Sequence, residues 1–376
     1  MIRKFSIESL FLAITFVFGL LYVFLLPPFQ SVDEGMHFFR SYQISEGHFV
    51  AKNSDGLIGD ELPTSLSNFY DAYYPFIKNI DRKSSTQEFL GNFNLKINPQ
   101  ERSFTQFTNT ALYSPVCYVS QTVGIFLGKF FSNNLGVTYY LGRISNLIFY
   151  CLFVYLALLI APFFKLPIFL LATLPMSLSL AGAYTCDVAV LGLNFIWFAL
   201  ILRMLVSDDI KISGISVKKY HLPIFMVLAF LITLTKSYVL LLPLIFLVLP
   251  KHLNSKKEYF TLIFGVIFSD KYDFRLSKLQ KTIALLTVLF GVILTYTSLY
   301  IMWTPVGNSV VLGLNGKYFI PLMLPFLLLF KNGAGRYDFE TVKLVIIIAI
   351  VVILISSDFS LLHRFYNMTP QLYYKI

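Results

Sequence analysis

The sequence predicts a helical protein that crosses a membrane many times, and three observations support this fold class. Hydrophobic residues make up 56% of the 376 residues, and charged residues make up 13%. The charged share is about half that of an ordinary soluble domain. Apolar runs of about 20 residues, long enough to span a bilayer, recur along the chain. A soluble globular enzyme and a disordered chain are therefore excluded.

The charge and cysteine content narrow the partners further. The 30 Lys and Arg residues exceed the 20 Asp and Glu residues, which gives a formal net charge of +10. In a membrane protein, such an excess gathers in short cytoplasmic loops. The chain has no basic stripe with interleaved aromatic residues, so no nucleic-acid partner is expected. Cys117, Cys151 and Cys186 form no CxxC pair, which argues against a structural disulfide or a zinc site.

The first apolar run spans residues 7–26. Arg3 and Lys4 precede it, and Pro27-Pro28 ends it without a small-residue cleavage motif. We therefore expect a retained transmembrane helix with a cytoplasmic N-terminus. The polar stretch that follows, residues 29–107, is then a long first extracytoplasmic loop, which we call the first loop. Its length and aromatic content predict short helices folded against the bundle.

The remaining apolar segments are uneven in length, and prolines interrupt several of them. Membrane helices tolerate such breaks where they face other helices or a cavity. The segments lie at about 111–131, 138–161, 166–185, 187–205, 222–235, 238–250, 282–303, 317–330 and 343–357.

Loop charge predicts the topology. The basic loops around Lys211, Lys251 and Lys331 should be cytoplasmic. Four apolar segments separate the first loop from Lys211, yet an odd number must cross. Segment 111–131 contains Ser-Pro and Ser-Gln pairs, so we expect it to be re-entrant or interfacial. About nine crossings remain, in one integral-membrane domain over residues 1–376 whose C-terminus lies outside.

The strongest candidate for chemistry follows the first membrane helix directly. Ser31 is expected to cap a helix whose first turn holds Asp33 and Glu34. On that helix, Asp33, His37 and Arg40 would share one face. A carboxylate there could serve as general base toward a sugar hydroxyl, and His37 and Arg40 could hold a phosphate. An ordinary helix cap with ion pairs on a solvated face is the alternative.

Further ionisable residues lie at the ends of apolar segments. Asp187 follows a membrane turn, where an acid is either functional or a helix cap. Lys236 and Lys317, the latter followed by Tyr318, could meet a lipid-linked phosphate or could snorkel to the interface. Arg143 could pair with Asp187 or with a substrate phosphate. The histidines show no metal-ligand spacing, and the chain has no phosphate loop or nucleophile elbow.

Several of these segments resemble one bacterial family of membrane proteins. The stretch PPFQSVDEGMHFFRSYQISEG at residues 27–47 resembles the start of the domain-of-unknown-function 2142 family. Residues 141–146, 174–187, 236–238, 303–307 and 316–321 resemble its later blocks. The resemblance covers nearly the whole chain, and its first and last blocks are the most specific.

That family is similar to glycosyltransferases of the GT-C type, so the resemblance implies a GT-C-like bundle in the bacterial plasma membrane. Such enzymes take sugar from a polyprenyl-phosphate carrier on the extracytoplasmic face. The resemblance assigns Asp33 to the catalytic acidic position and Glu34 to its acidic neighbour. Two departures stand out. Lys317 replaces the arginine of a Gly-Arg-Tyr motif, which removes bidentate phosphate binding. Ala183-Tyr-Thr-Cys186 replaces a Ser-Tyr-Ser-like lead-in to Asp187.

These inferences together give the hypothesis of an inverting glycosyltransferase. Asp33 would deprotonate or orient the hydroxyl of a glycan acceptor, and polyprenyl phosphate would leave the anomeric carbon. The developing phosphate charge would be stabilised by His37, Arg40, Lys236 and Lys317. The lipid tail would lie between helices near segment 111–131.

Three points stay open at the level of sequence. A divalent metal could bind through Asp33 and Glu34, but the reaction does not require one. A carrier or flippase for a lipid-linked glycan is an alternative. It predicts charged residues along a path through the bilayer, whereas this sequence clusters its candidate residues on one face of the membrane, which favours the enzyme. A non-catalytic subunit of a polysaccharide polymerase is another.

Overall fold

The computed structural model describes residues 5–79, 81–206, 211–212, 215–216, 221–235, 276–305, 308, 310–331 and 339–366. The chain forms two compact units. Unit 1 comprises residues 1–13, 152–177 and 190–350, and unit 2 comprises residues 14–151, 178–189 and 351–376. Each of the helices α1, α7, α10 and α15 contributes residues to both units.

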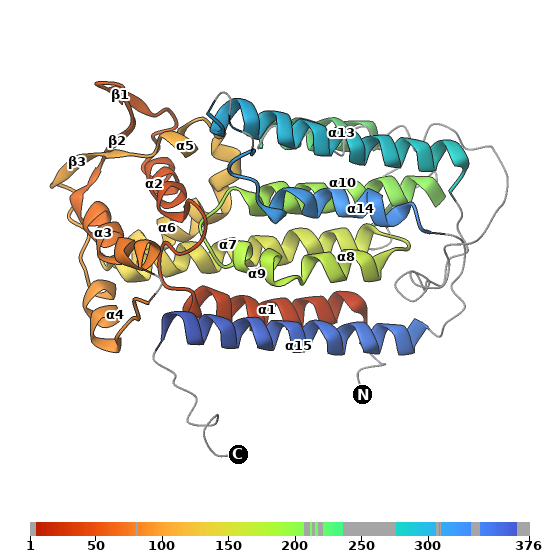
Figure 1. Ribbon diagram of the computed structural model, residues 1–376, viewed down its shortest axis with the longest axis horizontal. Helices are drawn as coiled ribbons and strands as arrows, with labels where there is room; N and C mark the ends of the chain where they lie inside the picture. The colour runs from red at the N-terminus through yellow and green to blue at the C-terminus, as the bar shows by residue number, and fades with distance from the viewer. Residues whose placement is uncertain are drawn as a thin grey trace, which may run out of the picture. The chain divides into compact units, whose positions relative to one another are not determined.

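Five of the described helices are long and apolar enough to cross a membrane, which confirms the helical membrane-protein class (Figure 1). They are α1 (Ile7–Leu25), α7 (Leu135–Ile160), α10 (Asp187–Val206), α13 (Lys278–Trp303) and α15 (Phe339–Phe365). The expected nine crossings would also require shorter helices and segment 238–250, which lies outside the described residues. That number therefore stays a prediction.

In unit 2, the first loop contains a small sheet as well as the expected short helices. Its elements are α2 (Glu34–Ser45), β1 (Lys52–Ser54), β2 (Leu57–Pro63), α3 (Thr64–Lys78), α4 (Thr86–Phe93) and β3 (Arg102–Gln106). The strands form an antiparallel sheet in the order β1-β2-β3. Asp55 and Gly56 connect β1 to β2, with φ angles of 52° and 83°. Positive φ at both residues is the geometry that an Asp-Gly hairpin turn adopts.

The segment predicted not to span is a short helical stretch after the first loop. It contains α5 (Thr108–Ala111), a 3₁₀ turn η2 (Pro115–Tyr118) and α6 (Val119–Phe131). With 13 residues, α6 is too short to cross a bilayer. Its buried face carries mainly small and polar residues, namely Ser120, Gln121, Gly124, Ile125 and Gly128. Its exposed face is apolar and bulky, namely Val119, Val123, Phe126, Leu127, Phe130 and Phe131.

Two glycines let the α6 backbone approach α7 closely. A Cβ atom on Gly124 would lie 2.2 Å from the carbonyl oxygen of Leu141 and 2.6 Å from the Cα of Gly142. A Cβ atom on Gly128 would lie 2.5 Å from the Cα of Thr138. Small residues at such contacts are typical of helices packed in a membrane.

The first loop also caps the C-terminal end of α15 in unit 2. Lys83 Nζ donates to the carbonyl oxygens of His363 at 2.6 Å and Arg364 at 2.8 Å. The backbone N–H of Ser84 donates to the carbonyl oxygen of Phe365 at 2.8 Å. These bonds satisfy carbonyl groups that a helix end otherwise leaves unpaired.

Unit 1 contains α8 (Lys165–Ala172), α11 (His221–Leu234), the two-residue strands β4 (Lys211–Ile212) and β5 (Ile215–Ser216), the 3₁₀ turn η5 (Gly316–Phe319) and α14 (Ile320–Leu328). Helix α14 contacts α13 and α8, and Figure 1 shows it alongside α13. The expected span at 166–185 is broken into α8 and α9 (Pro175–Ala181), because the residue before a proline disfavours the α conformation.

Candidate functional site

The start of α2 is held by a buried ion pair between Glu34 and Arg143, whose side chains are both fully buried. Oε1 of Glu34 accepts from Arg143 Nε at 2.8 Å, from the Tyr139 hydroxyl at 2.8 Å and from the Tyr184 N–H at 3.1 Å. Oε2 accepts from Arg143 Nη2 at 2.9 Å and from the Ser31 N–H at 3.2 Å. Glu34 is therefore saturated with donors inside the protein.

Arg143 is saturated too, because its remaining N–H groups reach the chain at the end of α1. They donate to the carbonyl oxygens of Val23 at 2.9 Å, Leu26 at 2.6 Å and Pro27 at 3.1 Å. All five guanidinium N–H groups thus have protein acceptors. The expectation that Arg143 pairs with Asp187 or with a substrate phosphate is wrong. Arg143 instead joins α7, α2 and the end of α1.

Asp33 differs from Glu34 in backbone conformation and in exposure. The helix begins at Glu34, and Asp33 precedes it in the left-handed conformation with φ 57°. The side chain of Asp33 is exposed, and in the described structure it makes no capping hydrogen bond. Aspartate tolerates this conformation better than most residues, but a strained residue held at a surface cavity is typical of a functional position.

Two expectations about the start of α2 are wrong, because the helix begins only at Glu34, after the left-handed Asp33. Ser31 does not cap the helix; the carboxylate of Glu34 accepts the N–H of Ser31 instead. Asp33 does not share a face with His37 and Arg40, because a left-handed residue lies outside the helical spacing.

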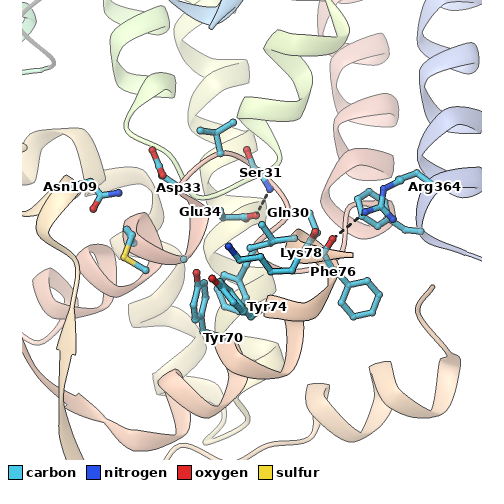
Figure 2. A pocket seen from close by; sticks show the side chains of 16 residues that line it. Gln30, Ser31, Asp33, Glu34, Tyr70, Tyr74, Phe76, Lys78, Asn109 and Arg364 are labelled. Carbon is cyan, nitrogen blue, oxygen red and sulfur yellow. Dashed lines mark hydrogen bonds between the residues drawn. The ribbon is translucent and has the colours of Figure 1, made fainter. Parts of the chain in front are cut away.

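Asp33 lies on the wall of a pocket of about 620 Å³ that is lined entirely by residues of unit 2. This volume falls within the usual range for small-molecule sites. Figure 2 shows Asp33 on the turn before α2 and Tyr70, Tyr74 and Lys78 projecting from α3. A Cβ atom on Gly35 would lie 2.3 Å from the Tyr70 ring, so glycine lets this ring lie against the first turn of α2. Burial raises the pKa of Tyr70, which is therefore a neutral hydroxyl at pH 7.

Two cations also line the pocket. Lys78 ends α3, and its Nζ lies 5.4 Å from the centroid of the Tyr74 ring. Arg364 enters from α15 and donates to the carbonyl oxygen of Phe76 at 3.1 Å (Figure 2). It also donates to the carbonyl oxygen of Arg82 at 3.3 Å. Sequence reasoning missed both. The spacing of Tyr70, Tyr74 and Lys78, four residues apart on one helix, could have indicated the α3 wall.

His37 and Arg40 are buried on α2 and do not line this pocket. His37 Nδ1 lies 2.9 Å from the Tyr118 hydroxyl, and its ring stacks on Tyr113 with 6.1 Å between centroids. Burial lowers the pKa of Arg40, although its guanidinium stays charged. Arg40 bonds to the side chain of Gln43 and to the carbonyl oxygen of Phe49.

Gln43 links this arginine to a buried carboxylate, Asp60, on β2. Asp60 accepts from Gln43 Nε2 at 2.8 Å, from Lys52 Nζ at 2.8 Å and from the Glu61 N–H at 2.8 Å. Burial opposes ionisation, but these three donors outweigh it and lower the pKa of Asp60. The network therefore attaches the hairpin β1–β2 to α2.

We expect Asp60→Asn to loosen this hairpin. A lowered pKa stabilises the fold above the ordinary carboxyl pKa, and this stability is lost as the pH falls. Asp60→Asn should therefore lower the Tm at pH 7, and its Tm should fall less than that of wild type as the pH is lowered. The substitution should also speed proteolysis between β1 and β2. Glu61→Gln, at an exposed neighbour, is the control. An unchanged acid profile in Asp60→Asn would contradict this account.

The other predicted residues lie away from the pocket or outside the described residues. Asp187 is the buried first residue of α10; its carboxylate accepts from the Thr185 hydroxyl at 2.9 Å, and that hydroxyl accepts the Asp187 N–H at 3.2 Å. Lys317 is buried in unit 1 within η5, and its Nζ lies 5.7 Å from the Tyr318 ring centroid. Lys236 lies outside the described residues.

The donor set does not fit a metal bound by Asp33 and Glu34. Among the described residues, no three His, Cys, Asp or Glu side chains converge as a ligand group. Both oxygens of Glu34 already accept from Arg143. A metal at Asp33 would therefore lack its second carboxylate.

A comparison with protein families identifies the chain. The profile of the family described as "Predicted membrane protein (DUF2142)" matches residues 16–272, which is more than half of the chain. The match includes every pocket residue named above except Arg364. A search of curated proteins and a search of solved structures each found no match. The chain belongs to the DUF2142 family of predicted membrane proteins.

Proposed function

We propose that this membrane protein is a GT-C-like glycosyltransferase. It transfers a sugar from a polyprenyl-phosphate donor to a cell-surface glycan on the extracytoplasmic face of the bacterial plasma membrane. The observation that carries the proposal is the pocket where the chain leaves α1. There an exposed carboxylate, Asp33, shares one cavity with the tyrosines of α3 and the cations Lys78 and Arg364.

Each group has a role in a single displacement. The acceptor hydroxyl oxygen attacks the anomeric carbon, and Asp33 takes the hydroxyl proton. The bond from the anomeric carbon to the phosphate oxygen breaks, and its electron pair leaves with polyprenyl phosphate. Lys78 and Arg364 stabilise the phosphate charge, in place of the buried His37 and Arg40. Tyr70 and Tyr74 offer ring faces to a sugar.

The buried ion pair serves this site indirectly. Glu34 and Arg143 fix the turn that carries Asp33, so they are positioning residues rather than groups that touch substrate. They hold the turn around Asp33, since Glu34, the next residue, is bonded to Arg143, and Ser31 and Pro27 before it are bonded to Glu34 and Arg143.

The proposal includes nine crossings and a re-entrant α6. Support for the re-entrant helix comes from its inverted polarity: it buries serine, glutamine and glycine and exposes phenylalanine. A helix in water would do the reverse, whereas a short helix in the outer leaflet would keep its polar groups inside the protein. Segment 165–181, as α8 and α9, would cross as a broken span.

Asp33→Asn tests the proposed base, because Asn keeps the shape and also tolerates a positive φ. Loss of general-base catalysis should lower transfer by roughly 100-fold or more. The matched control is Asp55→Asn, an exposed aspartate with φ 52° in the β1–β2 turn. The assay is surface-glycan composition in a deletion strain complemented with each variant, with protein amounts measured.

The outcomes separate the alternatives. If deletion and Asp33→Asn lose the same sugar and Asp55→Asn does not, the proposal stands. If only the deletion loses it, Asp33 is structural, and the protein acts as a carrier or as a non-catalytic subunit of a polymerase.

A further inference from the structure

Helix α15 carries a carboxyl group on its buried face. Asp358 is 7% exposed, and neither of its oxygens has a hydrogen-bond partner among the described residues. It lies one turn after the buried Leu354, within a segment apolar enough to span the membrane. Burying a leucine at this position would cost less free energy than burying an acid, so the acid indicates a function.

The surroundings of Asp358 offer hydroxyl groups rather than a cation. On the adjacent helix α1, the Tyr22 hydroxyl bonds to the hydroxyl of Ser357, the residue next to Asp358. Tyr22 also interacts electrostatically with Asp358. Further along α15, Arg364 is bonded to two carbonyl oxygens of the first loop. The desolvation of Asp358 is therefore not offset by an opposite charge in the described structure.

The size of the ligand follows from the burial of both oxygens. Asp358 does not line the pocket of unit 2, so that cavity offers no route for a metal or a sugar to reach it. An ionised carboxylate without a partner is too costly in this environment, whereas a proton needs no additional space. The protonated acid can also donate its O–H to a neighbouring hydroxyl oxygen.

We propose that Asp358 is a proton-binding site within the membrane, occupied when α15 packs against α1. We call the contact of Tyr22 and Ser357 the α1–α15 seam. Phe365 lies seven residues after Asp358 on the same helix face and lines the pocket. Loss of the proton would weaken the seam and so disturb the pocket wall. This inference stands independently of the enzymatic activity.

The sign of the pH dependence follows from linkage. A carboxyl group that the fold keeps protonated makes the protein most stable in acid, and this stability falls as the pH rises. Asp60 has the opposite signature, since it stabilises the fold in its ionised form and loses this effect in acid. The two carboxyl groups can therefore be distinguished in one set of measurements.

The test compares the Tm of the full chain in lipid nanodiscs from about pH 5 to about pH 8 for wild type, Asp358→Asn and Asp358→Leu. The wild-type Tm should fall relative to that of Asp358→Asn by about 2 °C or more as the pH rises. Asp358→Leu should fold and show the same pH profile as Asp358→Asn, which guards against a poorly folded Asn variant. Asp71→Asn, at an exposed aspartate of α3, is the control and should follow wild type.

A chemical probe gives a second readout. A membrane-soluble carbodiimide adds the O–H of a protonated carboxylic acid across its C=N bond, forming an O-acylisourea. It should label Asp358 in acid and progressively less as the pH rises, whereas a water-soluble carbodiimide should label Asp71. Parallel Tm profiles for wild type and Asp358→Asn, together with labelling that does not depend on pH, would overturn the proposal.

Discussion

Arg143→Gln should destabilise the protein by about 3–5 kcal/mol, because it leaves the Glu34 carboxylate buried without its counter-charge. The effect is large because two sets of bonds fail together. Glu34 loses two charged donors, and the carbonyl oxygens at the end of α1 lose the other three. The measurement is the free energy of unfolding in a mild detergent, or the Tm where unfolding is irreversible.

A double-mutant cycle separates this pair from a general loss of packing. Glu34→Gln alone should also be severe, and the double variant should be less damaged than the sum of the two single variants. The control is Arg102→Gln, which removes the partly exposed partner of Glu46 at 2.6 Å. Such a surface pair contributes about 1 kcal/mol or less. Additive effects of Glu34→Gln and Arg143→Gln would contradict the proposed coupling.

Gly124→Ala should separate α6 from α7. The new Cβ would lie 2.2 Å from the Leu141 carbonyl oxygen, and backbone atoms of a helix cannot rotate away as a side chain can. The helices must move apart, at a cost of about 1–3 kcal/mol or more. Thermal unfolding and the rate of proteolysis in the turn between α6 and α7 would measure this effect.

Gly91→Ala is the matched control, since Gly91 lies in helix α4 and a Cβ there meets open space. Alanine should be neutral there or stabilise α4 by up to about 1 kcal/mol. Equal Tm values for Gly124→Ala and wild type would mean that α6 does not pack as closely as the structure indicates.

The sequence predicted the parts of the fold that depend on hydrophobic length. The apolar runs beginning near Ile7, Thr138 and Asp187 all appear as long helices. The sheet in the first loop was missed, although Asp55-Gly56 between two short extended runs is a hairpin signal. The break between α8 and α9 was indicated by Pro175 but was interpreted as one span.

The candidate site was predicted in part. The motif after α1 directed attention to Asp33, which does lie in the pocket. Helical spacing could not reveal that Asp33 adopts a left-handed conformation while Glu34 turns inward to Arg143. Arg364 could not be found from sequence, because it reaches the pocket only through the packing of a distant helix.

The capped end of α15 constrains the path of the whole chain. In unit 2, Tyr22 meets Ser357 and Phe24 meets Tyr366, so α1 and α15 run in the same direction. Both end at the first loop, where Lys83 and Ser84 hold the last carbonyl groups of α15. Because both helices end at the first loop, the chain that leaves α1 on that side must reach the opposite side before α15 begins. The chain between them therefore makes an odd number of passages, and any revision of the topology must add or remove passages in pairs.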